Sequence, residues 1–317
     1  MDIVFMGSPD FAVPSLEVLA KNPVINVKAV ITQPDRKRGR GQKLQPTPVK
    51  EQAHLLRLNV LSERDVNHSQ FLDLLQGMAA DVIVVVAFGQ KLGTRLLSIA
   101  KYGCINLHAS LLPEYRGASP IHQALIDGRE FTGLTTIYMD QGWDTGDMIY
   151  QETVPIAKSD TFASLHDKLA VIGGKLLEKT LLAVEEGRAP RIEQEEERAT
   201  YAYKIDKNKG LINWEQGAAE LANLVRGVNP WPGAFTYMHG QLVKIWKVTP
   251  CAKNSAGQAV PGEVVSAKQE DGLIVQTGKG QLRIDQLQLT GRKSLTSREF
   301  LRGYQLKTGD RFKDNNE

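Results

Sequence analysis

DVIVVVAF at residues 81–88 is almost wholly apolar and rich in β-branched residues. A short run of this kind is typical of a strand that is buried on both faces of a parallel sheet. GCINLH (103–108) predicts the next strand, and DIVFM (2–6) and VINVKAVIT (24–32) predict two earlier ones. Amphipathic stretches alternate with these runs over the first 150 residues, which is the pattern of βαβ units. The sequence therefore predicts an α/β fold with a mainly parallel, Rossmann-like sheet.

Helices and two further strands complete this prediction. Pro14 opens a helix, and residues 119–127 fit another. LTTIYM (134–139) and MIYQETV (148–154) are predicted to be antiparallel strands that finish the sheet. Apolar residues then recur at three- and four-residue intervals from Ser159, which predicts a long helix that ends near Gly187.

The last third of the chain follows a different pattern. After a short helix around residues 216–227, brief β-rich segments alternate with Gly-containing turns, as in AFTYM, QLVKIWKV and GLIVQTG. This spacing favours a small β-barrel of the oligonucleotide-binding (OB) type. We therefore expect an α/β domain at 1–189, a polar linker at 190–206 and a barrel domain at 207–317.

Composition excludes several classes of protein. The 317 residues are 42% hydrophobic, so the chain can bury one or two cores and is not generally disordered. No apolar run reaches the ~20 residues that cross a bilayer, and the first residues lack the basic flank and apolar stretch of a signal peptide. Cys104 and Cys251 are too far apart for a C-x-x-C motif and are expected to be reduced core thiols. We expect a soluble, cytoplasmic protein with no membrane partner.

The charge is unevenly distributed along the chain. The overall net charge is +3, but residues 207–317 carry +6 and residues 1–206 carry −3. A basic C-terminal third suggests an anionic partner. Within the acidic part, five basic side chains fall within eight residues: Arg36, Lys37, Arg38, Arg40 and Lys43. Prolines bracket this segment, which contains two glycines and almost no apolar residue, so we expect a mobile, exposed loop.

Phosphate-binding motifs are missing from the predicted α/β domain. GSPDFA after the first strand lacks the later glycines of G-x-G-x-x-G, and no G-x-x-x-x-G-K-[ST] occurs. A nicotinamide-dependent dehydrogenase and a P-loop enzyme are therefore disfavoured.

Three polar side chains stand out instead. Asn106 and His108 are two residues apart on a predicted strand, so they lie on the same face, and they sit near the carboxyl end where open α/β sheets bind ligands. Asp144 lies between glycines in MDQGWDTGDM (139–148). An amide can donate to an oxyanion, an imidazole can move protons and a carboxylate can orient the imidazole. This trio predicts acyl or one-carbon transfer.

At these residues the sequence resembles a known family. INLHASLLPEYRGASPI (105–121) with DQGWDTGDM (140–148) resembles the folate-dependent formyltransferases. FMGSPDFAVPSLEVL (5–19), the basic segment TQPDRKRGRGQKLQPTPVK (32–50) and NPWPGAFT (229–236) narrow the resemblance to the methionyl-tRNA formyltransferase family, over nearly the whole chain.

The resemblance implies a reaction and a set of site residues. The family transfers the formyl group of 10-formyltetrahydrofolate to the α-amino group of methionyl initiator tRNA, with a Rossmann-like catalytic domain and a barrel that helps to hold the tRNA. It implies Asn106, His108 and Asp144 as catalytic residues and the basic loop as a tRNA contact. It places the folate against two segments, represented by Phe88, Gly89, Leu92, Ser110, Leu111, Leu112 and Pro113. No metal is implied, and we expect a monomer.

Two rival hypotheses remain at this point. Folate-dependent formylation of a sugar-nucleotide amine would use the same chemistry, but a small acceptor does not require the basic loop or the +6 C-terminal part. A non-catalytic RNA-binding protein on the same fold is disfavoured by the intact trio.

Overall fold

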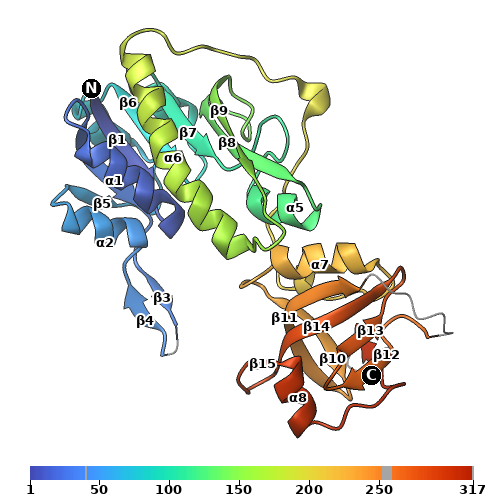
Figure 1. Cartoon of the computed structure of the whole chain (residues 1–317). Coiled ribbons are helices and arrows are strands. Elements are labelled where there is room, and N and C mark those ends of the chain that lie inside the picture. Colours follow the sequence, from blue (N-terminus) through green and yellow to red (C-terminus); the bar gives the residue numbers. More distant parts are fainter. Residues whose placement is uncertain (40, 252–258, 316–317) are drawn as a thin grey trace. The chain divides into compact units, whose positions relative to one another are not determined.

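The computed structural model describes residues 1–39, 41–251 and 259–315. The chain divides into two compact units (Figure 1). The first unit comprises Met1–Pro120, Phe131–Pro155 and His166–Ala202. The second comprises Ile121–Glu130, Ile156–Leu165 and Tyr203–Glu317.

A seven-stranded sheet forms the centre of the first unit, in the order β5-β2-β1-β6-β7-β8-β9. The five parallel strands are β5 (Val60–Ser62), β2 (Asn26–Thr32), β1 (Asp2–Gly7), β6 (Val82–Val86) and β7 (Cys104–His108). β8 (Phe131–Tyr138) pairs antiparallel with β7, and β9 (Met148–Pro155) pairs antiparallel with β8. All five residues of β6 are buried, as expected for a central strand. The mainly parallel, Rossmann-like sheet is confirmed.

Helices cover both faces of this sheet. α3 (Ser69–Gly77) and α4 (Thr94–Leu97) contribute Phe71, Leu75 and Leu96 to a core cluster that includes Met6 and Val85 of the sheet. On the other face, Gly173 of α6 (Phe162–Glu185) approaches Leu107, and Gly174 approaches α1 (Val13–Lys21). Figure 1 shows α1 and α6 side by side in front of the strands. α2 (Pro48–Leu55) also belongs to this unit, whereas α5 (Pro120–Ile126) lies almost wholly in the second unit.

The second unit is a curled antiparallel sheet with the strand order β12-β13-β14-β11-β10-β16. Its strands are β10 (Ala234–Met238), β11 (Gln241–Cys251), β12 (Val264–Lys268), β13 (Gly272–Gln276), β14 (Gln281–Leu289) and β16 (Phe312–Lys313); β15 (Leu295–Thr296) pairs with β14. An isolated bridge between Glu263 and Arg311 links the two ends of this order, so the sheet curls toward a barrel. This confirms the predicted architecture.

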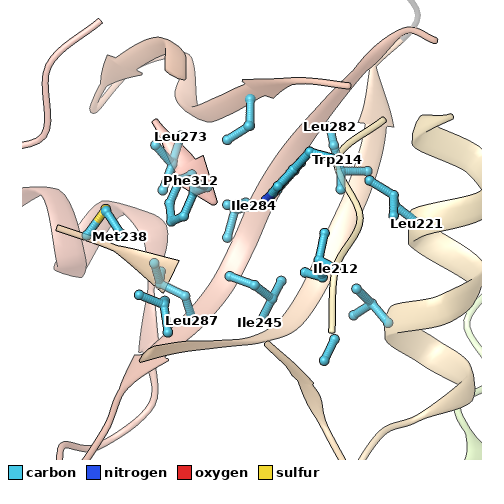
Figure 2. Packing of buried hydrophobic residues seen from close by; sticks show 14 of the residues in the cluster. Ile212, Trp214, Leu221, Met238, Ile245, Leu273, Leu282, Ile284, Leu287 and Phe312 are labelled. Carbon is cyan, nitrogen blue, oxygen red and sulfur yellow. The ribbon is translucent and has the colours of Figure 1, made fainter. Parts of the chain in front are cut away.

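The core of the second unit lies inside this curled sheet. Figure 2 shows Ile245, Ile284 and Leu287 from the strands packed with Leu221 from α7 (Ala218–Gly227) and with Trp214. The Trp214 indole N–H is satisfied by a 3.0 Å hydrogen bond to the Thr236 hydroxyl. α8 (Ser297–Gly303) adds the fully buried Phe300. In the part of the chain that the structure describes, no helix is long and apolar enough to cross a membrane.

Candidate active site

The structure brings Asn106, His108 and Asp144 together in the first unit. Asn106 and His108 project from β7 and are buried, while Asp144 reaches them from the loop between β8 and β9. The Asp144 Oδ1 atom lies 3.5 Å from both Asn106 Nδ2 and His108 Nδ1. This distance is at the outer limit of hydrogen bonding, as is common for catalytic groups that tighten on substrate. The three side chains thus converge at one place.

The two ring nitrogens of His108 face two acceptors. Nε2 donates a 2.9 Å hydrogen bond to the Tyr115 carbonyl, and Nδ1 faces the Asp144 carboxylate. A carbonyl oxygen can only accept, so Nε2 carries a hydrogen. A second hydrogen on Nδ1 would satisfy Asp144 as well. The backbone thus anchors Nε2, whereas Nδ1 has only the longer 3.5 Å contact to Asp144.

Asp144 is fixed in an unusual backbone conformation. Its φ of 57° lies in the left-handed region, which Asp tolerates better than most residues. Its Oδ2 accepts a 2.8 Å hydrogen bond from the Gly117 amide, so the two loops that surround the trio are tied together. Gly146 lets the loop pass close to β8, because a Cβ there would run into the Tyr138 carbonyl oxygen.

Gly146→Ala should lower kcat by about tenfold to a hundredfold, since a displacement of about 1 Å at a reacting group can cost that much. The added methyl meets backbone, which cannot rotate away, so the loop that carries Asp144 must shift. Gly77→Ala, at a site with open space around it, serves as the matched control. Both variants would be compared in steady-state kinetics of the formyl transfer that the resemblance implies. Equal kcat values for the two variants would show that the loop tolerates the displacement.

The predicted folate residues lie in two segments next to the trio. Ser110, Leu111, Leu112 and Pro113 follow β7, and this loop is fastened by Thr135 of β8 and Gln151 of β9. Thr135 accepts from the Leu112 amide at 3.1 Å and donates to the Ser110 carbonyl at 2.7 Å, and Gln151 Nε2 donates to the Leu112 carbonyl at 2.8 Å.

The second predicted folate segment turns sharply after β6. Ala87 and Gly89 both have positive φ, at 47° and 78°. Phe88 and Leu92 are buried in the core cluster, so this segment offers backbone groups rather than side chains to a ligand. The Phe88 carbonyl already accepts a 3.3 Å hydrogen bond from Gln33 Nε2.

A cavity of about 530 Å³ is lined by residues at the start of β7, at the opposite end of that strand from His108. Its walls include Cys104, Tyr138, Met139 and Arg191, and among the described residues neither the trio nor any predicted folate residue lines it. Burial raises the pKa of the Cys104 thiol to about 12, so this side chain stays a thiol at neutral pH. The thiol in this cavity therefore supplies no thiolate nucleophile at neutral pH.

The basic segment departs from the expected loop. β3 (Arg36–Arg38) pairs with β4 (Lys43–Gln45) in an antiparallel hairpin. Its base is held by a 2.8 Å ion pair between Lys50 and Asp35 and by a 2.6 Å hydrogen bond from Arg36 to Gln33. The segment was predicted to be a mobile, exposed loop; backbone pairing instead makes part of it a hairpin, although it has few apolar anchors. Lys37 and Lys43 are exposed, as predicted, whereas Arg40 and the side chain of Arg38 lie outside the described part of the structure.

Two buried side chains near the trio were not predicted. Arg116 lies in the loop after β7 and Gln194 lies in the polar segment that follows α6. Burial alone would lower the pKa of Arg116, but hydrogen bonds to Glu196 and Tyr201 outweigh this and raise it. Nothing in the local sequence marks these residues, because their partners lie about 80 positions away.

Comparison with known proteins identifies both halves of the chain. Residues 1–181 match the formyl transferase family model, and residues 204–305 match the formyl transferase C-terminal domain. Methionyl-tRNA formyltransferase of Halothermothrix orenii is 56% identical over 98% of this chain and 99% of its own, and that of Pelotomaculum thermopropionicum is 47% identical over 98% and 97%.

Among solved structures, an N-formyltransferase from Helicobacter canadensis, in complex with folinic acid and dTDP-3-aminofucose, has a similar fold. Its TM-score is 0.66 at 20% identity, and the match covers 89% of this chain and 98% of that one. At this identity the likeness concerns the fold alone.

Proposed function

The chain belongs to the methionyl-tRNA formyltransferase family, and we propose that it takes the formyl group from 10-formyltetrahydrofolate and transfers it to methionyl initiator tRNA. Membership of this family identifies the activity as formylation of methionyl-tRNA. The observation that carries our mechanism is the convergence of Asn106 Nδ2 and His108 Nδ1 on one carboxylate oxygen of Asp144.

The reaction would proceed through a tetrahedral intermediate. The free α-amine of the methionyl group attacks the formyl carbon, and the carbonyl oxygen becomes an oxyanion. Asn106 Nδ2 carries two hydrogens and His108 Nδ1 can carry one, so both can donate to that oxygen. The pre-set positions of these donors would stabilise the intermediate more than the starting carbonyl.

Proton movement then completes the transfer. The attacking nitrogen must lose a proton, and N10 of the folate must gain one as its bond to the formyl carbon breaks. Asp144 and His108 lie side by side and can relay this proton. The Tyr115 carbonyl holds the ring of His108 from its other side, so the imidazole can exchange a proton at Nδ1 without turning.

The folate is proposed to bind beside the trio, against the turn at 87–92 and the loop at 110–113. The hydrogen bonds from Thr135 and Gln151 keep the second of these in place. The backbone groups of the turn at 87–92 are suited to the ring of a pterin, which presents several donors and acceptors in one plane.

The donor and the tRNA identity can be tested in one assay. We expect labelled formyl from 10-formyltetrahydrofolate to appear on methionyl initiator tRNA much faster than on methionyl elongator tRNA. Equal rates for the two tRNAs would refute the preference for the initiator. If methionyl-tRNA were formylated with a crude folate pool but not with 10-formyltetrahydrofolate, the identity of the proposed formyl donor would be refuted.

The β3–β4 hairpin is proposed to contact the acceptor end of the tRNA through Arg36, Lys37, Arg38, Arg40 and Lys43. The exposed ammonium groups of Lys37 and Lys43 are available to phosphates, whereas the Arg36 guanidinium is partly engaged with Gln33. Binding of a long RNA through phosphates releases counterions, so its affinity falls steeply with salt.

Replacing Lys37 and Lys43 together by alanine should raise the KM for methionyl-tRNA and flatten its dependence on log salt by about 1–2 in slope, since each phosphate contact contributes roughly 0.9. The KM for the folate should not change, because neither lysine belongs to the proposed folate segments. Lys21→Ala together with Lys175→Ala, which removes the same charge from α1 and α6, is the control. An unchanged salt slope in the hairpin variant would remove the hairpin from the tRNA site.

A further inference from the structure

The polar segment at residues 192–202, here called the strap, is hydrogen-bonded to both loops that surround the trio. Its backbone pairs with β9 through Ile192 and Met148, with hydrogen bonds of 2.8 and 3.0 Å. Farther along, the Arg116 amide donates to the Thr200 carbonyl at 2.8 Å, and the Ala202 amide donates to the Arg116 carbonyl at 2.8 Å. The strap therefore spans the distance between the Asp144 loop and the loop after β7.

Arg116 is the side chain that the strap encloses. It is 1% exposed, and a buried guanidinium must be paired if its desolvation is to be offset. Its Nε donates to Gln194 Oε1 at 3.1 Å and its Nη1 to Glu196 Oε2 at 2.7 Å. A Cβ on the following residue, Gly117, would lie 2.9 Å from the Ala202 carbonyl oxygen, so glycine allows this close approach.

The neighbours of Arg116 in the chain hold the catalytic side chains. The Tyr115 carbonyl accepts from His108 Nε2, and the Gly117 amide donates to Asp144 Oδ2. Tyr115 is itself held by the strap, since its amide donates to the Thr200 hydroxyl at 2.8 Å. Any shift of Arg116 would move both of these backbone groups.

Gln194 binds the backbone of the loop that carries Asp144. Its side-chain amide donates to the carbonyls of Asp144 and Gly146, at 2.7 and 2.8 Å, while its oxygen accepts from Arg116. The residue is buried, so both hydrogens and the oxygen are engaged within the protein. One side chain thus joins the backbone of the catalytic aspartate to the arginine between the two anchoring residues.

We propose that Arg116 and Gln194 are positioning residues, which together with the strap fix the positions of the His108 and Asp144 side chains relative to each other. The proposal rests on the proposed function, because it assumes that His108 and Asp144 carry the formyl transfer. Arg116 acts through the neighbouring backbone groups of Tyr115 and Gly117, and Gln194 acts through the backbone of the loop that carries Asp144.

Gln194→Met in the full-length protein provides the test, because it keeps the length of the side chain and removes both its donor and its acceptor. We expect kcat for methionyl-tRNA formylation to fall about tenfold or more, as a small displacement of reacting groups can cost up to ~10²-fold. The KM values for folate and tRNA should change less than about twofold, since the proposed contacts to them remain. Glu193→Gln, at the exposed neighbouring position, is the matched control and should keep the parental kcat.

A double-mutant cycle separates positioning from general destabilisation. If Gln194 acts through Asp144, then Gln194→Met should change kcat little once Asp144 is already alanine. A parental kcat for Gln194→Met, or a loss that is the same in the Asp144→Ala background, would overturn the proposal. If Asp144→Ala alone kept the parental kcat, the role proposed for Asp144 would fail and this inference with it, whereas absence of formylation by the parent protein would refute the proposed function itself.

Arg116→Lys gives a second variant in which the positive charge is kept. Because the ammonium group keeps a positive charge for Glu196, kcat should fall less than in Arg116→Met. It should still lie below the parental value, since a single ammonium group cannot reproduce the guanidinium fork that reaches Gln194 and Glu196 together. Equal, parental kcat values for both arginine variants would contradict a positioning role for Arg116.

Discussion

His108→Ala is expected to lower kcat for methionyl-tRNA formylation by about 10²–10⁴-fold, the usual contribution of a general acid or base. The imidazole is the group that can both donate to the oxyanion at Nδ1 and pass a proton to the leaving nitrogen, and it is held at Nε2 by the Tyr115 carbonyl. Removing it leaves the substrates bound, so their KM values should change little. Steady-state kinetics with saturating folate would measure both parameters.

His54→Ala is the matched control for this variant, because His54 is exposed on α2 and alanine suits a helix. It should keep the parental kcat. If His108→Ala kept more than about a third of the parental rate with chemistry limiting, its assigned role would be wrong.

Asn106→Ala is expected to lower kcat by about 10²–10³-fold, the effect of removing one oxyanion donor. The Asn106 amide is buried on β7, and its Nδ2 atom faces Asp144 at 3.5 Å, with a second hydrogen left for substrate. Asn106→Asp tests the same point more sharply, because it keeps the shape but replaces the donor with an acceptor that faces another carboxylate. Single-turnover measurements of formyl transfer would compare the two variants.

We expect Asn106→Asp to be at least as slow as Asn106→Ala, since the new carboxylate would repel the oxyanion. An Asn106→Asp variant with the parental single-turnover rate would exclude hydrogen-bond donation by Asn106.

Asp144→Ala should also lose turnover at near-normal tRNA affinity.

Local patterns in the sequence are enough to predict most of the sheet. β6 and β7 follow from continuous apolar runs, and α6 follows from regular apolar spacing, because burial on both faces or on one stripe leaves a direct mark on composition. The trio could be predicted for a related reason: Asn106 and His108 are the polar residues of a buried strand that is otherwise apolar.

Features held by hydrogen bonds were harder to predict. The β3–β4 hairpin consists largely of basic residues, and Leu44 within it is exposed, so no apolar alternation reveals its strands. The strap is also polar, so it too lacks an apolar pattern that would reveal its packing. Its contacts are backbone pairs and hydrogen bonds of the polar side chains of Gln194, Glu196 and Thr200, and the partners of these groups lie in distant parts of the sequence.

Transfer of labelled formyl from 10-formyltetrahydrofolate to three acceptors tests the account most directly: methionyl-tRNA, uncharged tRNA and a sugar-nucleotide amine. The account predicts rapid labelling of methionyl-tRNA by the parent protein, losses of at least about 10²-fold for Asn106→Ala and His108→Ala, and no labelling of the other two acceptors. Comparable labelling of the amino sugar, or parental rates for both variants with methionyl-tRNA, would contradict it.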